Sequence, residues 1–344
     1  MKAFSTLIVL LSLTLLFSCD GNISSGKGRT ILISVASDYT DSDQNTPRLG
    51  NTPNDQAAIV GQISELAKGN IEVYVFRVDN GRRYAISPDS FSKEIFEYGK
   101  LADIEDRKNG LSLARTKRIL VNEENVQYFP RWTFSDVLKT IERLNAGKDD
   151  LIIFHYSGHG ASDGSLLSYS NDKTSDIVGT NNIINTLCAY NKEAVKVMLI
   201  DSCFSGTYIK DTILSSTNKL EIEGKKDIYK GSSIIEALIG SFEVALGKDT
   251  YGTPNLFVLS ASTNRQESFD GINNGDENQQ YYGAFSFYLL RALGFDTSGS
   301  KPAYTSKEIT FANLYHEIWT SFPLSTKKEQ TPLATPTPLD VVLF

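Results

Sequence analysis

The sequence has few cysteines, a single long apolar run and no excess of basic residues, and each shortage excludes a class of protein. Three cysteines among 344 residues are too few for a disulfide framework. Lys and Arg total 34 against 41 Asp and Glu, and the net charge of −7 argues against nucleic acid or an anionic membrane surface as the main partner. Hydrophobic residues make up 40% of the chain, which is ordinary for a soluble globular protein.

The one long apolar run lies at the N-terminus and predicts a lipoprotein signal. Met1 and Lys2 are followed by uncharged residues up to Phe17, a run too short for a comfortable membrane span. Its end, Leu-Phe-Ser-Cys at 16–19, resembles a bacterial lipobox. We therefore expect a signal peptide at 1–18, lipid on Cys19, a tether at 19–29 and an exported domain held at the bacterial cell envelope, on its periplasmic or surface side. An ordinary cleaved signal peptide is the alternative.

Two short apolar runs in the middle of the chain each deliver a reactive side chain at their carboxyl end. Leu-Ile-Ile-Phe-His-Tyr at 151–156 runs into Ser-Gly-His-Gly, and Val-Lys-Val-Met-Leu-Ile at 195–200 runs into Asp-Ser-Cys-Phe-Ser-Gly. Such runs, bounded by glycine, predict central strands of a parallel sheet. Because the carboxyl ends of parallel strands meet at one edge, we expect His159 and Cys203 to share a crevice. A thiol beside an imidazole is the minimum equipment for a cysteine nucleophile.

The rest of the chain predicts strands alternating with helices, and therefore an α/β domain over residues 30–344 with a largely parallel sheet covered on both faces. Residues 79–130 show no clear pattern and are interpreted as an insertion or an elaborated crossover, and 207–255 as a long linker region. Residues 163–180 are expected to form a polar loop. Further strands are predicted at 30–36, 71–78, 256–260 and 339–344, and helices beginning at 54 or 55, 133, 182, 283 and 310.

The two strand-end motifs resemble those of the caspase-like cysteine peptidases, and within them the metacaspase and bacterial caspase-domain branch. The resemblance rests on His-Tyr-Ser-Gly-His-Gly at 155–160 and Asp-Ser-Cys-Phe-Ser-Gly at 201–206, two motifs in the family's order. Supporting segments lie at 49–55, 259–262 and 329–332. The resemblance implies a three-layer α/β/α sandwich around a mostly parallel six-stranded sheet, with no cofactor.

By position in these motifs, the resemblance implies that Cys203 is the nucleophile and His159 its base. The chemistry agrees, because a nearby imidazole and a polar crevice raise the thiolate fraction of a cysteine, and the imidazole later protonates the leaving amine. The resemblance also implies an oxyanion hole formed by the backbone N–H groups of Gly160 and Cys203. Each such donor is worth about 3 kcal/mol in the transition state.

The resemblance further implies that Asp201, Asp55 and Ser157 form the pocket beside the nucleophile. Buried carboxylates that face a cleft favour a guanidinium or ammonium partner, so the expected substrates are proteins or peptides with Arg or Lys before the cut. Two bland alternatives stay open. Asp55 is also placed to cap a helix, and Asp201 to be held at a strand end by backbone N–H groups.

Three other residues are assigned packing roles. His155 lies within a predicted strand and is interpreted as a packed histidine. His316 is expected on the surface of a helix, and Cys188 on the buried face of another, where it does not pair with Cys203.

Metal binding and self-cleavage have weak support in the sequence. A zinc site made of His155, His159 and Cys203 matches no common ligand spacing. The loop 270–280 fails the EF-hand calcium pattern at Ile272. The segment 219–230 lies where some caspase-like peptidases cut themselves, and it is interpreted as a charged, solvated linker.

The sequence therefore predicts a membrane-anchored cysteine endopeptidase that cuts after Arg or Lys. One alternative is a caspase-fold lipoprotein that binds partners and cuts nothing, although a binding module has no need of both His159 and Cys203. Another is a thiol-dependent hydrolase or transferase with non-peptide substrates, which only the resemblance excludes.

Overall fold

The computed structural model describes residues 28–37, 39, 49–68, 70–78, 126–129, 132–169, 175–205, 255–263, 265–271, 282–294, 308–327, 329–335 and 341–344. The expected signal peptide at 1–18, Cys19, most of the tether, the linker 219–230, and most of 79–130, 207–255 and 270–280 lie outside these residues and stay predictions. In the part of the chain that is described, no helix has the length and apolarity that a membrane crossing requires.

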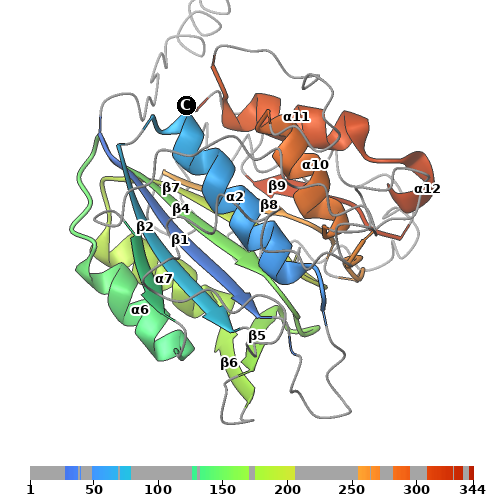
Figure 1. The fold of residues 1–344 in the computed structure, drawn as a ribbon, viewed down its shortest axis with the longest axis horizontal. Helices are drawn as coiled ribbons and strands as arrows, with labels where there is room; N and C mark the ends of the chain where they lie inside the picture. The colour runs from blue at the N-terminus through green and yellow to red at the C-terminus, as the bar shows by residue number, and fades with distance from the viewer. Residues whose placement is uncertain are drawn as a thin grey trace, which may run out of the picture.

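A seven-stranded sheet forms the centre of the fold (Figure 1). All neighbouring strands pair in parallel except the last two, which are antiparallel. The predicted α/β fold with a mostly parallel sheet is confirmed, with one strand more than expected. In spatial order the strands are β3 (Val126–Phe129), β2 (Ile71–Val78), β1 (Thr30–Ser37), β4 (Leu151–Ser157), β7 (Val195–Asp201), β8 (Leu256–Ser260) and β9 (Leu333–Thr335).

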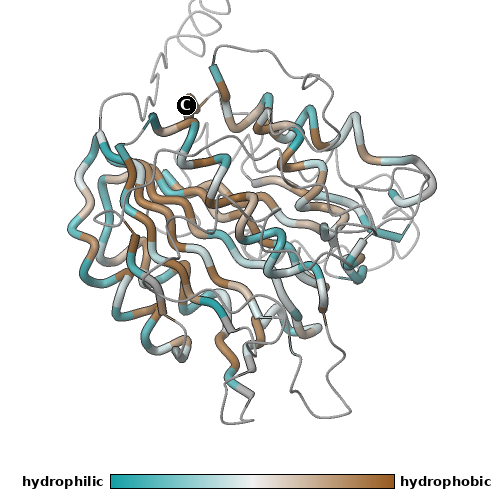
Figure 2. Tube along the Cα trace, viewed as in Figure 1, coloured by the Kyte–Doolittle hydropathy of each residue, from teal (hydrophilic) through white to brown (hydrophobic). Residues whose placement is uncertain are grey.

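The central strands β1, β4 and β7 are buried along their whole length and are mostly apolar, and the hydrophobic colour in Figure 2 follows them. Neighbouring residues of one strand contribute to two separate cores. In β4, Ile153 packs into one core and Phe154 into the other, and Val197 and Met198 do the same in β7. Full burial of each such side chain is worth about 1.5–3 kcal/mol, so the sheet is held from both sides.

Helices cover both faces of the sheet, which confirms the three-layer architecture. One core is closed by α2 (Thr52–Leu66), α10 (Ala284–Ala292) and α11 (Phe311–Ser321). The other is closed by α6 (Phe134–Arg143) and α7 (Thr180–Tyr190). A short α12 (Leu324–Lys327) precedes β9. In Figure 1, α2 crosses the strands, and α10 and α11 lie on the side of β8 and β9.

The polar loop expected at 163–180 is wrong. The structure has an antiparallel hairpin there, formed by β5 (Ser165–Tyr169) and β6 (Ser175–Gly179), and α7 begins at Thr180. Leu166 and Val178 pack into the core beneath α6 and α7. Strands of five residues, each with one hydrophobic residue in the core, leave too little periodicity in the sequence to be detected.

Two further boundaries differ from the prediction. The strand expected at 339–344 is wrong: residues 341–344 lie beside the start of α11, where Ile309 donates to the Phe344 carbonyl at 2.9 Å. The antiparallel edge of the sheet is β9 instead. Helix α2 begins at Thr52, with Pro53 in its first turn and Asn51 at its N-cap. Asp55 therefore lies inside the helix, and its interpretation as a cap is wrong.

Candidate active site

The candidate site lies where β4 and β7 end. These strands pair so that Ser157 lies opposite Asp201, and the Gly158 N–H extends the ladder by donating to the Asp201 carbonyl at 3.1 Å. His159 and Cys203 each follow two residues after this last pair. Both line one cavity of about 380 Å³, so the structure brings together the two residues expected to share a crevice.

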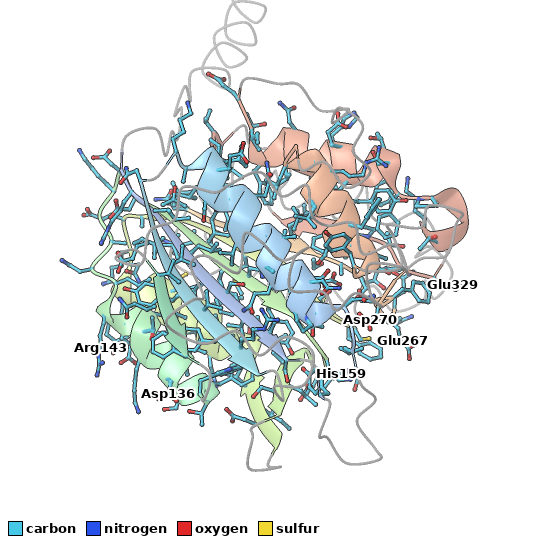
Figure 3. The ribbon with its side chains drawn as sticks, in the orientation of Figure 1. Asp136, Arg143, His159, Glu267, Asp270 and Glu329 are labelled. Atoms are coloured by element: carbon cyan, nitrogen blue, oxygen red, sulfur yellow. The ribbon has the colours of Figure 1, made fainter. Side chains whose placement is uncertain are left out.

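The cavity also contains every other residue that the sequence assigned to the site. Acidic side chains are prominent in its wall, and Figure 3 shows Glu267 and Asp270 labelled beside His159 at the same end of the molecule. The predicted residues that line the cavity are Asp55, Ser157, His159, Gly160, Asp201 and Cys203. The other residues of its wall are Leu49, Thr52, Gly158, Ser202, Phe204, Glu267, Ser268, Phe269, Asp270 and Gly283.

Two tyrosines hold His159 in place. Its backbone N–H donates to the Tyr39 hydroxyl at 2.9 Å, and its carbonyl accepts from the Tyr156 hydroxyl at 2.6 Å. The Tyr39 ring packs edge-on against the imidazole, with ring centroids 4.4 Å apart. The Tyr39 hydroxyl in turn donates to the Leu167 carbonyl of β5 at 2.5 Å. These contacts fix the position of the imidazole at the rim of the cavity.

The Cys203 sulfur contacts one backbone segment after β8. The N–H of Ser268 donates to Sγ at 3.3 Å, and the thiol faces the Ser268 carbonyl at 3.8 Å. Burial raises the pKa of the thiol, the N–H lowers it, and the negative charges of Glu267 and Asp201 raise it further. The sequence-based expectation of an enriched thiolate is therefore wrong for the resting site, because the motif shows neither the burial nor the surrounding acids.

Asp201 is buried at the end of β7 and is held by two serines. Its Oδ1 accepts from the Ser268 hydroxyl at 2.6 Å, and its Oδ2 accepts from the Ser286 N–H at 3.0 Å and the Ser286 hydroxyl at 2.7 Å. Burial raises the pKa of Asp201 although these hydrogen bonds lower it. The alternative of a carboxylate tied only by backbone N–H groups does not describe it, because side-chain hydroxyls supply most of its donors.

Asp55 reaches the same cavity from α2. Its Oδ2 accepts from the Ser157 hydroxyl at 2.7 Å, and its Oδ1 accepts from the Gly283 N–H at 3.0 Å. Burial and, second, the Asp201 charge raise its pKa well above the usual value, despite the Ser157 hydrogen bond. Two buried carboxylates thus face each other in one cavity, where a cation would relieve their repulsion.

Two glycines are required by close approach. A Cβ on Gly160 would lie 2.2 Å from the Cys203 carbonyl oxygen. A Cβ on Gly283 would lie 2.5 Å from Asp201 Oδ2 and 3.1 Å from Asp55 Oδ2, so only glycine leaves the space between the two carboxylates open. The donation of the Gly160 N–H to an oxyanion stays a prediction.

The remaining candidates lie away from the cavity. His155 is buried in β4, where its Nδ1 lies 2.9 Å from the Ser34 hydroxyl, and burial lowers its pKa to about 3. His316 is exposed, and Cys188 is a buried cysteine on α7 that is not part of a disulfide. Since His155 does not line the cavity, the zinc triad considered for the sequence is not assembled. Among the described residues, no group of three or more His, Cys, Asp or Glu has the arrangement of a metal site.

Sequence reasoning missed the residues that support the site rather than form it. Tyr39, Ser268 and Ser286 belong to no motif singled out in the sequence, and Gln330 was noted only as part of a segment near the C-terminus. Their contacts join segments that are 61 to 128 residues apart. The Gln330 side chain, fully buried, accepts from the Phe269 N–H at 3.0 Å and donates to the Ser268 hydroxyl at 3.1 Å.

Comparison with known proteins gives a family match over most of the chain. The family profile described as "Caspase domain" matches residues 40–341. No curated protein matches the chain. Among solved structures, protein GSU0716 from Geobacter sulfurreducens aligns with a TM-score of 0.44 and 14% identity, covering 90% of this chain and 95% of that one. Caspase-1 from Spodoptera frugiperda aligns with a TM-score of 0.44 and 10% identity, covering 94% and 93%.

The raised pKa of Asp55 predicts that Asp55→Asn stabilises the protein at neutral pH. The stability that protonated Asp55 contributes is complete below the unfolded-state pKa of about 3.9 and is lost as the pH rises through the higher folded-state pKa. Each unit of difference corresponds to about 1.4 kcal/mol. Asparagine keeps both contacts, because its oxygen accepts from Gly283 and its amide donates to Ser157. Thermal unfolding should therefore show a higher Tm for the variant at pH 7 and a shrinking difference toward pH 4.

The matched control is Asp163→Asn on the surface. A backbone hydrogen bond from Ser165 lowers the pKa of Asp163, so this substitution should have the opposite sign near neutral pH and a small size, since the site is exposed. A Tm difference for Asp55→Asn that does not change with pH would show that ionisation of the Asp55 carboxyl does not cause the change in stability.

Proposed function

The chain belongs to the caspase-domain family, and from this premise we propose that it is a cysteine endopeptidase that cleaves peptide bonds after Arg or Lys. Members of this family are generally cysteine peptidases that act on proteins. The observation that carries the finer proposal is that a thiol, an imidazole and two buried carboxylates line a single cavity.

In the proposed reaction, His159 removes the proton from Cys203 as the sulfur attacks the scissile carbonyl. The raised pKa of the thiol makes this base necessary, because little thiolate is present at neutral pH. The backbone N–H groups of Gly160 and Cys203 stabilise the oxyanion. His159 then gives its proton to the leaving amine, and water hydrolyses the acyl-enzyme through the same base.

The proposed specificity comes from the carboxylates of Asp55 and Asp201. Each keeps acceptor capacity beyond its protein contacts: Asp201 Oδ1 and both oxygens of Asp55 have one donor each. A guanidinium or ammonium group would complete these hydrogen bonds and neutralise two like charges in a buried site. An acidic substrate side chain would add a third negative charge there and be rejected.

The rival function is a caspase-fold protein that binds a partner without cleaving it. A binding surface gains nothing from a thiol that accepts a hydrogen bond beside an imidazole clamped by Tyr39 and Tyr156. The cavity geometry therefore favours the peptidase. The two functions differ in whether the protein cleaves peptides and whether that cleavage needs Cys203.

Cleavage of fluorogenic peptides tests the proposal. The full chain should cut peptides with Arg or Lys before the reporter group and leave those with Asp or Glu intact. Cys203→Ala and His159→Ala should each lower kcat/KM by about 10⁴-fold or more. Cys188→Ala, at the other cysteine that the structure describes, should keep the wild-type rate because its thiol lies outside the cavity. Turnover that survives Cys203→Ala would contradict the proposed nucleophile.

Charge selectivity is tested with the same peptides and Asp201→Asn. The loss of one buried charge partner costs about 2 kcal/mol or more, which is about 30-fold in kcat/KM for Arg and Lys peptides. A peptide with a neutral residue at that position should lose less. An equal loss for both peptides would assign Asp201 a structural role instead.

We also propose that the domain is tethered to the cell envelope through Cys19, on the strength of the lipobox-like segment at 16–19. Expression in a bacterial host should place the chain in the membrane fraction and add a diacylglyceryl mass to Cys19. Cys19→Ser should release the chain to the soluble fraction. An unmodified Cys19 in a processed wild-type chain would support an ordinary cleaved signal peptide.

A further inference from the structure

Ser268 contacts both chemically active parts of the cavity at once. Its backbone N–H donates to the Cys203 sulfur at 3.3 Å, and its side-chain hydroxyl donates to Asp201 Oδ1 at 2.6 Å. Ser268 therefore links the proposed nucleophile, Cys203, to Asp201, the acid expected to bind the basic side chain of the substrate. A change in charge at Asp201 therefore acts on Ser268, whose N–H would stabilise a Cys203 thiolate.

The orientation of Ser268 is fixed by Gln330. The Gln330 amide donates to the Ser268 hydroxyl at 3.1 Å and to the Ala261 carbonyl at 3.3 Å, and its oxygen accepts from the Phe269 N–H at 3.0 Å. Since a hydroxyl has one proton, and Gln330 donates to its oxygen, the Ser268 proton is directed to Asp201. The residue is thus held between a buried amide and a buried carboxylate, with its N–H aimed at the sulfur.

The charges that surround the sulfur are predominantly negative. Asp201 and Glu267 disfavour the thiolate, and Asp55 and Asp270 line the same cavity. Of the described residues in the cavity wall, only His159 can carry a positive charge. Burial first, and then the charges of Glu267 and Asp201, raise the pKa of the thiol and so favour its protonated form when no cation is bound. A cation against Asp201 would cancel a buried charge that raises the pKa of the thiol, and would so favour thiolate formation.

We propose that Ser268 is a positioning residue that couples the acidic pocket to the nucleophile, so that a basic side chain bound against Asp201 activates the Cys203 thiol. This inference rests on the proposed function, since it takes Cys203 as the nucleophile. In the activated state the S–H bond breaks, its proton passes to His159, and the Ser268 N–H bonds to the negative sulfur. Coupling is reciprocal: loss of the thiol proton strengthens binding of the cation by the same factor. The Cys203 thiol then becomes reactive when a basic substrate is bound and stays protonated and unreactive otherwise.

The test measures alkylation of Cys203 by neutral iodoacetamide, site by site with mass spectrometry, between pH 6 and pH 10 at constant ionic strength. Methylguanidinium supplies the cation, and N-methylurea, nearly the same in shape but uncharged, is the matched control. With the wild-type chain, methylguanidinium should raise the rate at pH 7 about fivefold and move the midpoint of the pH profile to lower pH. N-methylurea should do neither. If methylguanidinium only blocked access to Cys203, the alkylation rate at high pH would fall and the midpoint of the pH profile would not move.

Variants separate the parts of the coupling. In Asp201→Asn, Cys203 should be alkylated faster than in the wild type at pH 7 without ligand, and methylguanidinium should not change that rate. Ser268→Ala keeps the N–H but loses its anchor, so its alkylation with methylguanidinium present should be slower than wild type, and Ser268→Thr should restore it. Ser268→Ala that matches wild type at every pH would overturn the positioning role.

His159→Ala distinguishes the two levels of the argument. Alkylation that is the same in wild type and His159→Ala would contradict the dyad and with it the proposed function. Alkylation that depends on His159 but does not respond to methylguanidinium would overturn the coupling alone. The comparison of the two ligands uses the unmodified chain, so it stands even where a variant fails to fold.

Discussion

The site depends on the parallel pairing of β4 with β7. This register places Ser157 opposite Asp201, and the Gly158 N–H continues it by donating to the Asp201 carbonyl. Because both strands end at the same level, the loops that carry His159 and Cys203 start side by side. A slip of one residue in this register would turn the side chains of one strand to the opposite face of the sheet and would separate Asp201 from the pocket. The apolar contacts on both faces of the sheet are what hold the register.

The site concentrates like charges in a buried space, and this arrangement carries a cost. Asp55 and Asp201 are buried with raised pKa values, and burial together with the charges of Glu267 and Asp201 raises the pKa of the Cys203 thiol. A folded protein gains nothing from such an arrangement unless a cation binds there. Stability lost at a functional site is a common consequence of pre-organising it for a ligand. In the proposed mechanism, the charges that would select a basic side chain would also keep the nucleophile unreactive until that side chain binds.

Much of the fold could be predicted because its signals are local. The apolar runs of β1, β4, β7 and β8 mark strands buried on both faces, and the two motifs at the ends of β4 and β7 name residues that line the cavity. The hairpin of β5 and β6 and the edge strand β9 were missed, since strands of three to five residues are too short for a periodicity to show in the sequence. Helix α2 starts earlier than predicted because Pro53, and not a capping side chain on Asp55, marks its first turn.

The supporting contacts could not be predicted, for a different reason. Tyr39 contacts His159 across 120 residues of chain, and Ser268 contacts Cys203 across 65. A serine or a tyrosine in a loop has no sequence pattern that reveals such a contact. The pKa of Cys203 was misjudged for the same reason, since a motif shows the partner imidazole but neither the depth of the sulfur nor the acids gathered around it.

The most direct measurement is the crystal structure of the chain after reaction with a peptidyl acyloxymethyl ketone that carries arginine next to the reactive group. The account predicts a thioether to the Cys203 sulfur, an imidazole within hydrogen-bond reach of the reacting centre, and the guanidinium between the carboxylates of Asp55 and Asp201. The same reagent with aspartate in place of arginine should leave Cys203 unmodified. Modification of Cys203 with the arginine side chain outside the cavity, or equal reaction with both reagents, would contradict it.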